Sequence, residues 1–111
     1  MSRSAVTTHV LDTAAGHPAR NVQVRLETRV GDGWQELGAA RTDDDGRVSA
    51  IGPAAVEAGD YRLIFDTAGY FGDREHFFPE VVVTFTVADP AQHHHVPLLL
   101  SPFAISTYRG S

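Results

Sequence analysis

The chain has 111 residues, no cysteine and a formal net charge of −5; 42% of its residues are hydrophobic and 21% are charged. This composition predicts a single folded domain over residues 1–111, and the negative charge argues against a nucleic acid partner, which would require a basic patch. The absence of cysteine excludes disulfides and thiolate metal sites and favours a cytoplasmic location, and no apolar run approaches the ~20 residues that cross a membrane.

Eight short segments carry the residue pattern of β-strands. They are residues 6–11, 22–27, 34–37, 47–51, 61–66, 81–87, 93–100 and 103–108. Turns rich in Gly, Asp and Pro separate them at ~8–12 residue spacing, which is typical of an antiparallel β-sandwich. We therefore predict an all-β fold, an antiparallel β-sandwich with one short helix.

Four features of these segments lead to more specific expectations. Residues 12–21 are predicted to form a loop, and residues 67–75 to form the one short helix, capped by Thr67. Residues 81–87 are all β-branched or aromatic, so we expect a strand with little solvent on either face. Pro97 lies inside a predicted strand, which indicates a sheet edge or a bulge.

Alternation separates apolar from polar side chains in the first and last strands. In residues 93–100 the valine and leucines at even positions share one face, and His93 and His95 share the other. His9 likewise lies opposite the apolar positions of the first strand, and Ile105 is assigned to the inward face of the last strand. Because a sandwich packs only the inner face of each sheet, His9 and His95 are expected to point outward.

The first functional hypothesis is a catalytic group made of His9, Arg47 and His95. Arg47 follows a turn that could carry it to the same region as the two histidines. Two imidazoles and a guanidinium can activate water and stabilise an oxyanion, and the arginine disfavours a protonated histidine. The alternative is structural, because an isolated histidine on a polar strand face is usually solvent-exposed, and Arg47 is by default a turn residue.

The second hypothesis is a metal site. His93 and His95 share one face of a strand, and His9 could complete a three-histidine zinc site with an open position for water. Against zinc, no clear carboxylate lies near the histidine run to orient such ligands.

Four stretches of the chain form a specific combination. They are Thr8-His9-Val10-Leu11-Asp12, Asp45-Gly46-Arg47, His95-Val96-Pro97-Leu98-Leu99-Leu100-Ser101-Pro102, and the tail Ser106-Thr107-Tyr108-Arg109-Gly110-Ser111. Together they resemble the transthyretin-like protein family, and within it the 5-hydroxyisourate hydrolases, over nearly the whole chain. The ending Tyr-Arg-Gly-Ser is what separates these hydrolases from the hormone-carrying transthyretins. Members usually have an aromatic residue where this chain has His94, and often a tyrosine where it has Ile105.

The resemblance implies a fold, an assembly and a reaction. The fold would be a transthyretin-like sandwich of two four-stranded sheets, and the assembly a homotetramer with substrate sites at the dimer–dimer interface. The reaction would be the hydrolysis of 5-hydroxyisourate to 2-oxo-4-hydroxy-4-carboxy-5-ureidoimidazoline in urate catabolism, without a metal or another cofactor.

The resemblance also implies the site residues. The catalytic residues would be His9, Arg47 and His95, and the substrate-binding residues Ser106, Tyr108, Arg109, Gly110 and Ser111. Two alternatives stay open: a transthyretin-type carrier that binds a small ligand without catalysis, and a zinc-dependent hydrolase.

Overall fold

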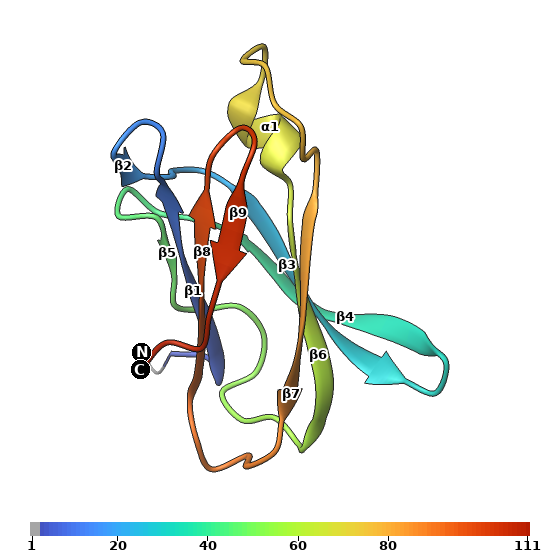
Figure 1. Ribbon diagram of the computed structural model, residues 1–111. Coiled ribbons are helices and arrows are strands. Elements are labelled where there is room, and N and C mark those ends of the chain that lie inside the picture. The colour runs from blue at the N-terminus through green and yellow to red at the C-terminus, as the bar shows by residue number, and fades with distance from the viewer. Residues whose placement is uncertain (1–2) are drawn as a thin grey trace.

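Two β-sheets packed face to face, with one short helix at one end, make up the computed structural model, which describes residues 3–111 (Figure 1). In chain order the elements are β1 (Val6–Asp12), β2 (His17–Pro18), β3 (Gln23–Val30), β4 (Gly33–Arg41), β5 (Arg47–Val48), β6 (Gly59–Phe65), α1 (Thr67–Phe71), β7 (Val81–Val87), β8 (His94–Leu100) and β9 (Ile105–Thr107). One sheet has the order β2-β1-β8-β9, with β5 paired to β1, and the other has the order β4-β3-β6-β7. The predicted all-β sandwich with one short helix is confirmed.

The first sheet differs from the expectation in its details. It has five strands because the two-residue strands β2 and β5 both pair with β1. Strand β2 lies within residues 12–21, where a loop was expected, and β5 ends at Val48 rather than at residue 51. Strands β1 and β8 are parallel, whereas the other strand pairs of the described chain are antiparallel. This parallel pair brings the beginning and the end of the sequence together.

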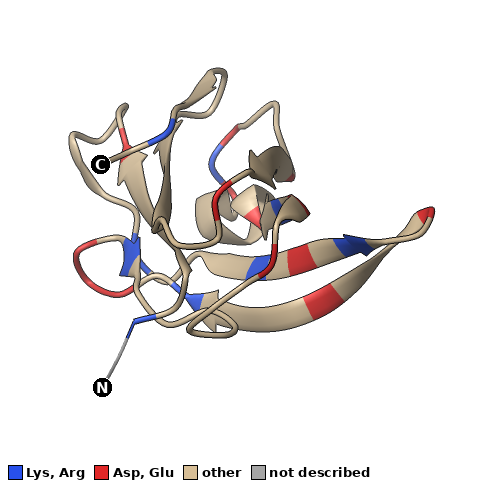
Figure 2. Ribbon diagram, turned by 90° about the horizontal axis from the view of Figure 1, so that it is seen from below, with Lys and Arg blue, Asp and Glu red and all other residues tan. Residues whose placement is uncertain are grey.

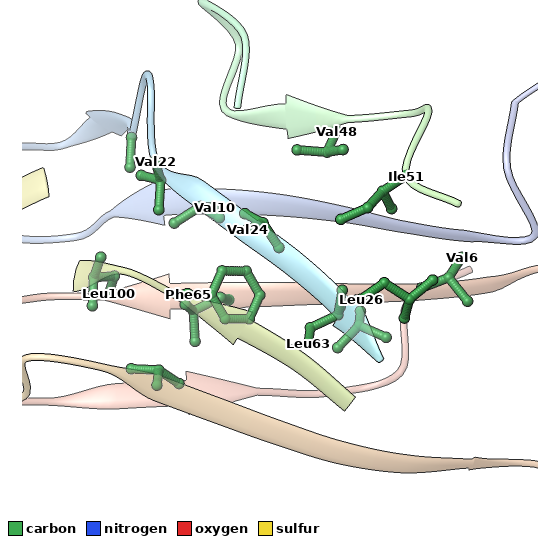
Figure 3. Close-up of a cluster of buried hydrophobic side chains, with 14 of the residues drawn as sticks. Val6, Val10, Val22, Val24, Leu26, Val48, Ile51, Leu63, Phe65 and Leu100 are labelled. Atoms are coloured by element: carbon green, nitrogen blue, oxygen red, sulfur yellow. The ribbon is translucent and has the colours of Figure 1, made fainter. Parts of the chain in front are cut away.

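The core lies between the sheets and is built from apolar side chains of both. Its fully buried members, several of which are seen in Figure 3, include Val6, Val10, Val24, Leu26, Leu63, Phe65 and Leu100. Burying one such side chain contributes about 1.5–3 kcal/mol. A slip of one residue in β1 would replace Val6, Thr8 and Val10 on the inner face with Thr7, His9 and Leu11, so this register is strongly specified. The polar face of β1 therefore points away from the core.

Strands β7 and β9 are edge strands, and this corrects two predictions. The expectation that residues 81–87 are buried on both faces is wrong, because Val82 is 46% exposed while Val81 and Val87 are buried. Ile105, expected to face inward, is 41% exposed. β-Branched and aromatic residues favour any strand, and their presence does not distinguish an edge strand from a central one.

The predictions for β8 agree with the structure in part. His94 alternates away from His95 and is buried beside the core, as expected from the two-residue period. Pro97 is also buried and is flanked by β1, but the ladder to β9 begins only at Leu98. Pro97 therefore lies one residue before the β8–β9 ladder, rather than on an open edge or in a bulge.

Helix α1 is shorter than predicted and has a different cap. It ends at Phe71 rather than at residue 75, and the Asp66 side chain accepts a hydrogen bond from the Gly69 amide at its start. Thr67, expected as the cap, is buried, and its hydroxyl donates to the Phe78 carbonyl oxygen. A carboxylate one residue earlier thus replaces the predicted hydroxyl cap.

Asp12 connects the end of β1 to the helical segment. Its carboxylate accepts hydrogen bonds from the Tyr70 hydroxyl at 2.6 Å and from Arg74 Nη2 at 2.9 Å. Burial alone would raise the pKa of Asp12, but the bonds from Tyr70, Arg74 and the Ala15 amide outweigh it and lower this pKa to about 2. Burial and the bond to Asp12 raise the pKa of Tyr70 to about 12. The charged carboxylate is therefore stabilised in the folded state.

We expect Asp12→Asn to lower the free energy of unfolding at pH 7 by about 2 kcal/mol, from a pKa shift of nearly two units. Because the folded pKa lies below that of the unfolded chain, this stabilisation is present above about pH 4 and is lost as the pH falls toward 2. Urea unfolding of wild type and variant at several pH values measures it. A difference that stays constant down to pH 2 would contradict the assignment, and Asp60→Asn, on a half-buried strand position where the carboxylate accepts a bond from the Thr86 hydroxyl, serves as the control.

Charged residues of both signs alternate along the long hairpin of β3 and β4. Figure 2 shows these acidic and basic positions interleaved along the ribbon. Within residues 3–111, no helix has the length and apolar character needed to cross a bilayer.

Candidate active site

The registers of β1 with its two neighbours bring the predicted catalytic residues to one face of the five-stranded sheet. Thr7 is paired with His95 across β1 and β8, and His9 is paired with Arg47 across β1 and β5. Because directly paired side chains lie on the same face, Thr7, His9, Arg47 and His95 all point outward from the sandwich. The sequence placed the two histidines on outer faces, and the structure adds that these faces are continuous.

A cavity of about 210 Å³ opens on this face. Its lining consists of Arg3, Thr7, Thr8, Arg47, Val48, Ser49, His93, His95 and Ser111. The lining combines imidazole, guanidinium and hydroxyl groups, so it suits a polar, electron-rich ligand. Arg47 is exposed on the solvent side, where its guanidinium can reach such a ligand.

His9 lies beside this cavity rather than in its lining. Its Nε2 is 2.8 Å from the carbonyl oxygen of Asp45, in the turn that precedes Arg47. A carbonyl oxygen only accepts hydrogen bonds, so Nε2 of His9 carries a proton. The neutral form of His9 therefore has its lone pair on Nδ1.

The imidazole of His95 is half-buried and has basic side chains around it. Burial, followed by the nearby Arg47 and His9, lowers the pKa of His95 below its ordinary value of 6.5. Burial and the neighbouring Arg3 also lower the pKa of His93. Both rings are therefore neutral at physiological pH, which is the state that a proton acceptor requires.

The C-terminal tail contributes two of its predicted residues to this region. The Gly110 amide donates a 2.8 Å hydrogen bond to the His95 carbonyl oxygen, and Ser111 lines the cavity. Tyr108 and Arg109 line a different cavity, between β7 and β8, and Arg109 also bonds the Gln92 side chain at 2.8 Å. Ser106 is paired with Leu99 and lines a third hollow beside β7.

We expect Gly110→Ala to lower kcat by about 10-fold, because misplacing a reacting group by about 1 Å can cost up to 10²-fold. A Cβ at this position would stand 2.6 Å from His95 Cδ2, so the ring or the tail must shift. Steady-state kinetics measure the loss, and unchanged kcat would show that the tail does not fix this ring. Gly33→Ala, where the added Cβ meets nothing closer than 3.8 Å, serves as the control.

The described histidines are not grouped as metal ligands. Among residues 3–111, no three His, Asp or Glu side chains are placed to hold a metal ion. His93 and His95 instead share one partner, the hydroxyl of Thr7, at 2.8 Å from His93 Nε2 and 2.8 Å from His95 Nδ1. The donor set therefore gives no support to the zinc alternative.

Sequence reasoning missed Thr7, Arg3 and Ser49 as parts of this region. Thr7 carried a signal, because it alternates onto the same face of the first strand as His9. Its contact with His93 and His95 depends on the parallel pairing of β1 with β8. No local sequence pattern predicts this pairing. Arg3 and Ser49 lie in irregular segments and carried no comparable signal.

Comparisons with known proteins agree in fold and sequence. The HIUase/Transthyretin family matches residues 6–110. The chain is 46% identical over 109 residues to the 5-hydroxyisourate hydrolase of Salmonella typhimurium, covering 96% of this chain and 80% of that protein. It is 45% identical over 113 residues to the 5-hydroxyisourate hydrolase of Mus musculus, covering 97% and 96% of the two chains.

Two solved structures are similar over all or nearly all of their length. The 5-hydroxyisourate hydrolase of Klebsiella pneumoniae has a TM-score of 0.85 and 34% identity, and the match covers 100% of both chains. Sea bream transthyretin in complex with thyroxine has a TM-score of 0.87 and 29% identity, with 96% of this chain and 94% of that one covered.

Proposed function

The chain belongs to the HIUase/Transthyretin family, and we propose that it acts as a hydrolase through His9, Arg47 and His95 on the outer face of its five-stranded sheet. The reaction is the hydrolysis of 5-hydroxyisourate in urate degradation. The observation that carries the site assignment is the position of His95, which is neutral, lines the cavity and lies beside Arg47.

In the proposed mechanism His95 is the general base. Its imidazole takes a proton from water, and the resulting hydroxide adds to a carbonyl carbon in the six-membered ring of 5-hydroxyisourate. The carbonyl electrons move to oxygen, and the Arg47 guanidinium stabilises this oxyanion. Collapse breaks the ring C–N bond, and the departing nitrogen takes the proton that His95 received. The product is then 2-oxo-4-hydroxy-4-carboxy-5-ureidoimidazoline.

His9 and the tail have supporting roles in this proposal. His9 is held by the Asp45 carbonyl next to Arg47, where it orients the substrate. Gly110 and Ser111 flank His95 at the cavity, and Arg109 anchors the tail through its bond to the Gln92 side chain, while Tyr108 lines the neighbouring cavity.

The assembly and location extend the proposal. The cavity is open on a sheet face, and a water-poor site forms there if another subunit covers it, which supports a homotetramer with sites at the dimer–dimer interface. Exposed apolar side chains on the edge strands, Val82 and Ile105 among them, are also suited to burial between subunits. Light scattering would contradict this assembly if it found monomers at micromolar concentration.

The sequence without cysteine suits the proposed cytoplasmic location.

The direct test generates 5-hydroxyisourate with urate oxidase and follows its ultraviolet decay with and without the protein. We expect a large acceleration that persists in the presence of a metal chelator. Decay no faster than the spontaneous rate would overturn the hydrolase and leave a ligand carrier, whereas loss of activity in chelator would favour the zinc-dependent alternative.

The pH profile gives a second expectation. Because the pKa of His95 is held below its ordinary value of 6.5, the acid limb of kcat/KM, where His95 takes up a proton, should have its midpoint below pH 6.5. Initial rates between pH 5 and 8 measure the acid limb. An acid limb above pH 7 would mean that a different group is the base.

A further inference from the structure

Thr7 occupies an unusual position between two imidazoles. Its hydroxyl oxygen lies 2.8 Å from His95 Nδ1 and 2.8 Å from His93 Nε2, and the residue is only 5% exposed. A threonine hydroxyl has one proton, so it donates to one of these nitrogens and accepts from the other. The protonation of the two rings is therefore coupled through Thr7.

We propose that Thr7 and His93 are positioning residues that hold the His95 proton on Nδ1 and leave Nε2 of His95 free to accept a proton from water. This inference rests on the proposed function, in which His95 is the general base. In this arrangement His95 Nδ1–H donates to Thr7 Oγ1, and the Thr7 hydroxyl donates to Nε2 of His93.

The surroundings of His95 favour this direction of the hydrogen bonds. Within the described chain, Thr7 is the only hydrogen-bond partner of the His95 ring, so Nε2 is without a partner and is available to a ligand. The charged groups that lower the pKa of His95 are Arg47, His9, His93 and Arg3, all of them basic, and Tyr108 and Arg109 line a second cavity beside it. No carboxylate is among these neighbours to orient the ring, so that function falls to Thr7.

His93 is suited to be the end of this chain of hydrogen bonds. It must be unprotonated at Nε2 to accept from Thr7, and burial together with Arg3 lowers its pKa, which keeps the ring neutral. When His95 gains a proton at Nε2, its Nδ1–H still has an acceptor in Thr7. Protonated His93 would instead force Thr7 to accept from it, and the Thr7 proton would then turn to His95 Nδ1 and move the His95 proton to Nε2.

The test compares Thr7→Val with Thr7→Ser. Valine keeps the β-branched shape and removes the hydroxyl, so we expect kcat to fall about 10-fold or more, part of the 10²–10⁴-fold that a general base supplies, with KM little changed. Serine restores the hydroxyl, so the kcat of Thr7→Ser should lie within about 3-fold of the wild-type kcat. Thr13→Val removes a hydroxyl that bonds the Leu100 carbonyl oxygen at the other end of β1, and it should leave kcat and the pH profile unchanged.

A second readout does not depend on activity. In the ¹⁵N spectrum of the wild type we expect the proton of neutral His95 on Nδ1, and in Thr7→Val a shift toward Nε2. A wild-type His95 protonated on Nε2, or a Thr7→Val enzyme with wild-type kcat and pH profile, would overturn the inference. If the wild type fails to accelerate 5-hydroxyisourate decay, it is the proposed function that fails, and the ¹⁵N spectrum still decides the tautomer.

Discussion

Replacement of His95 with asparagine is expected to lower kcat by about 10²-fold or more, the scale of a general base. The asparagine amide can still bond the Thr7 hydroxyl, as His95 Nδ1 does at 2.8 Å, but it has no group that accepts a proton from water. The loss should therefore appear in kcat rather than in the melting temperature. Single-turnover rates of 5-hydroxyisourate decay separate this effect from slower product release.

His17 and His76 provide matched controls for this prediction. His17 is exposed and bonds the Pro18 carbonyl, and His76 stacks on Phe71 away from the cavity lining. Alanine at either position should leave turnover within a few-fold of wild type. A comparable loss at one of them, or wild-type turnover in His95→Asn, would show that the site has been assigned to the wrong face.

The second large effect is expected for Arg47→Ala, which should lower kcat/KM by about 10²-fold, as when an oxyanion donor is removed. Arg47→Lys should recover only part of this loss, because an ammonium group lacks the planar fork of the guanidinium. The same change should alter the pH profile. Arg47 lowers the pKa of His95, so its removal lets that pKa rise, and the acid limb of kcat/KM moves to higher pH.

The shift of the acid limb distinguishes a role beside His95 from a general loss of folding. Arg29→Ala is the control, because Arg29 lies in β3 and packs over Trp34, on the other sheet. It should leave both the rate and the profile unchanged. An Arg47→Ala enzyme with reduced activity and an unmoved acid limb would place Arg47 farther from His95 than proposed.

The strands of the sandwich, and which of their side chains point inward or outward, were largely predictable from sequence because a strand has a fixed two-residue period. The alternation in β1 and β8 correctly separated His9 and His95 from the buried Val10 and Leu98. It also placed His94 on the inner face, although the three adjacent histidines are chemically identical. Core burial enforces this pattern, and it can therefore be read without coordinates.

The relations between distant strands were not predictable in the same way. The edge positions of Val82 and Ile105 depend on which strand has no neighbour, and this is a property of the whole sheet. The contact of Thr7 with His93 and His95 depends on parallel pairing between segments whose local patterns are equally compatible with antiparallel pairing. The sequence therefore indicated which residues are polar and outward, but not which of them touch.

The parallel pairing of β1 with β8 also has a consequence for biosynthesis. Thr7 and His95 are 88 positions apart, so a ribosome has made most of the protein before the second partner exists. Until then the emerging polypeptide carries His9 and Arg47 without the proposed base, and contacts of such long sequence separation form slowly. On the proposed mechanism, catalytic competence is acquired in one late step, and we expect an interrupted translation product lacking β8 to be inert toward the urate-derived metabolite.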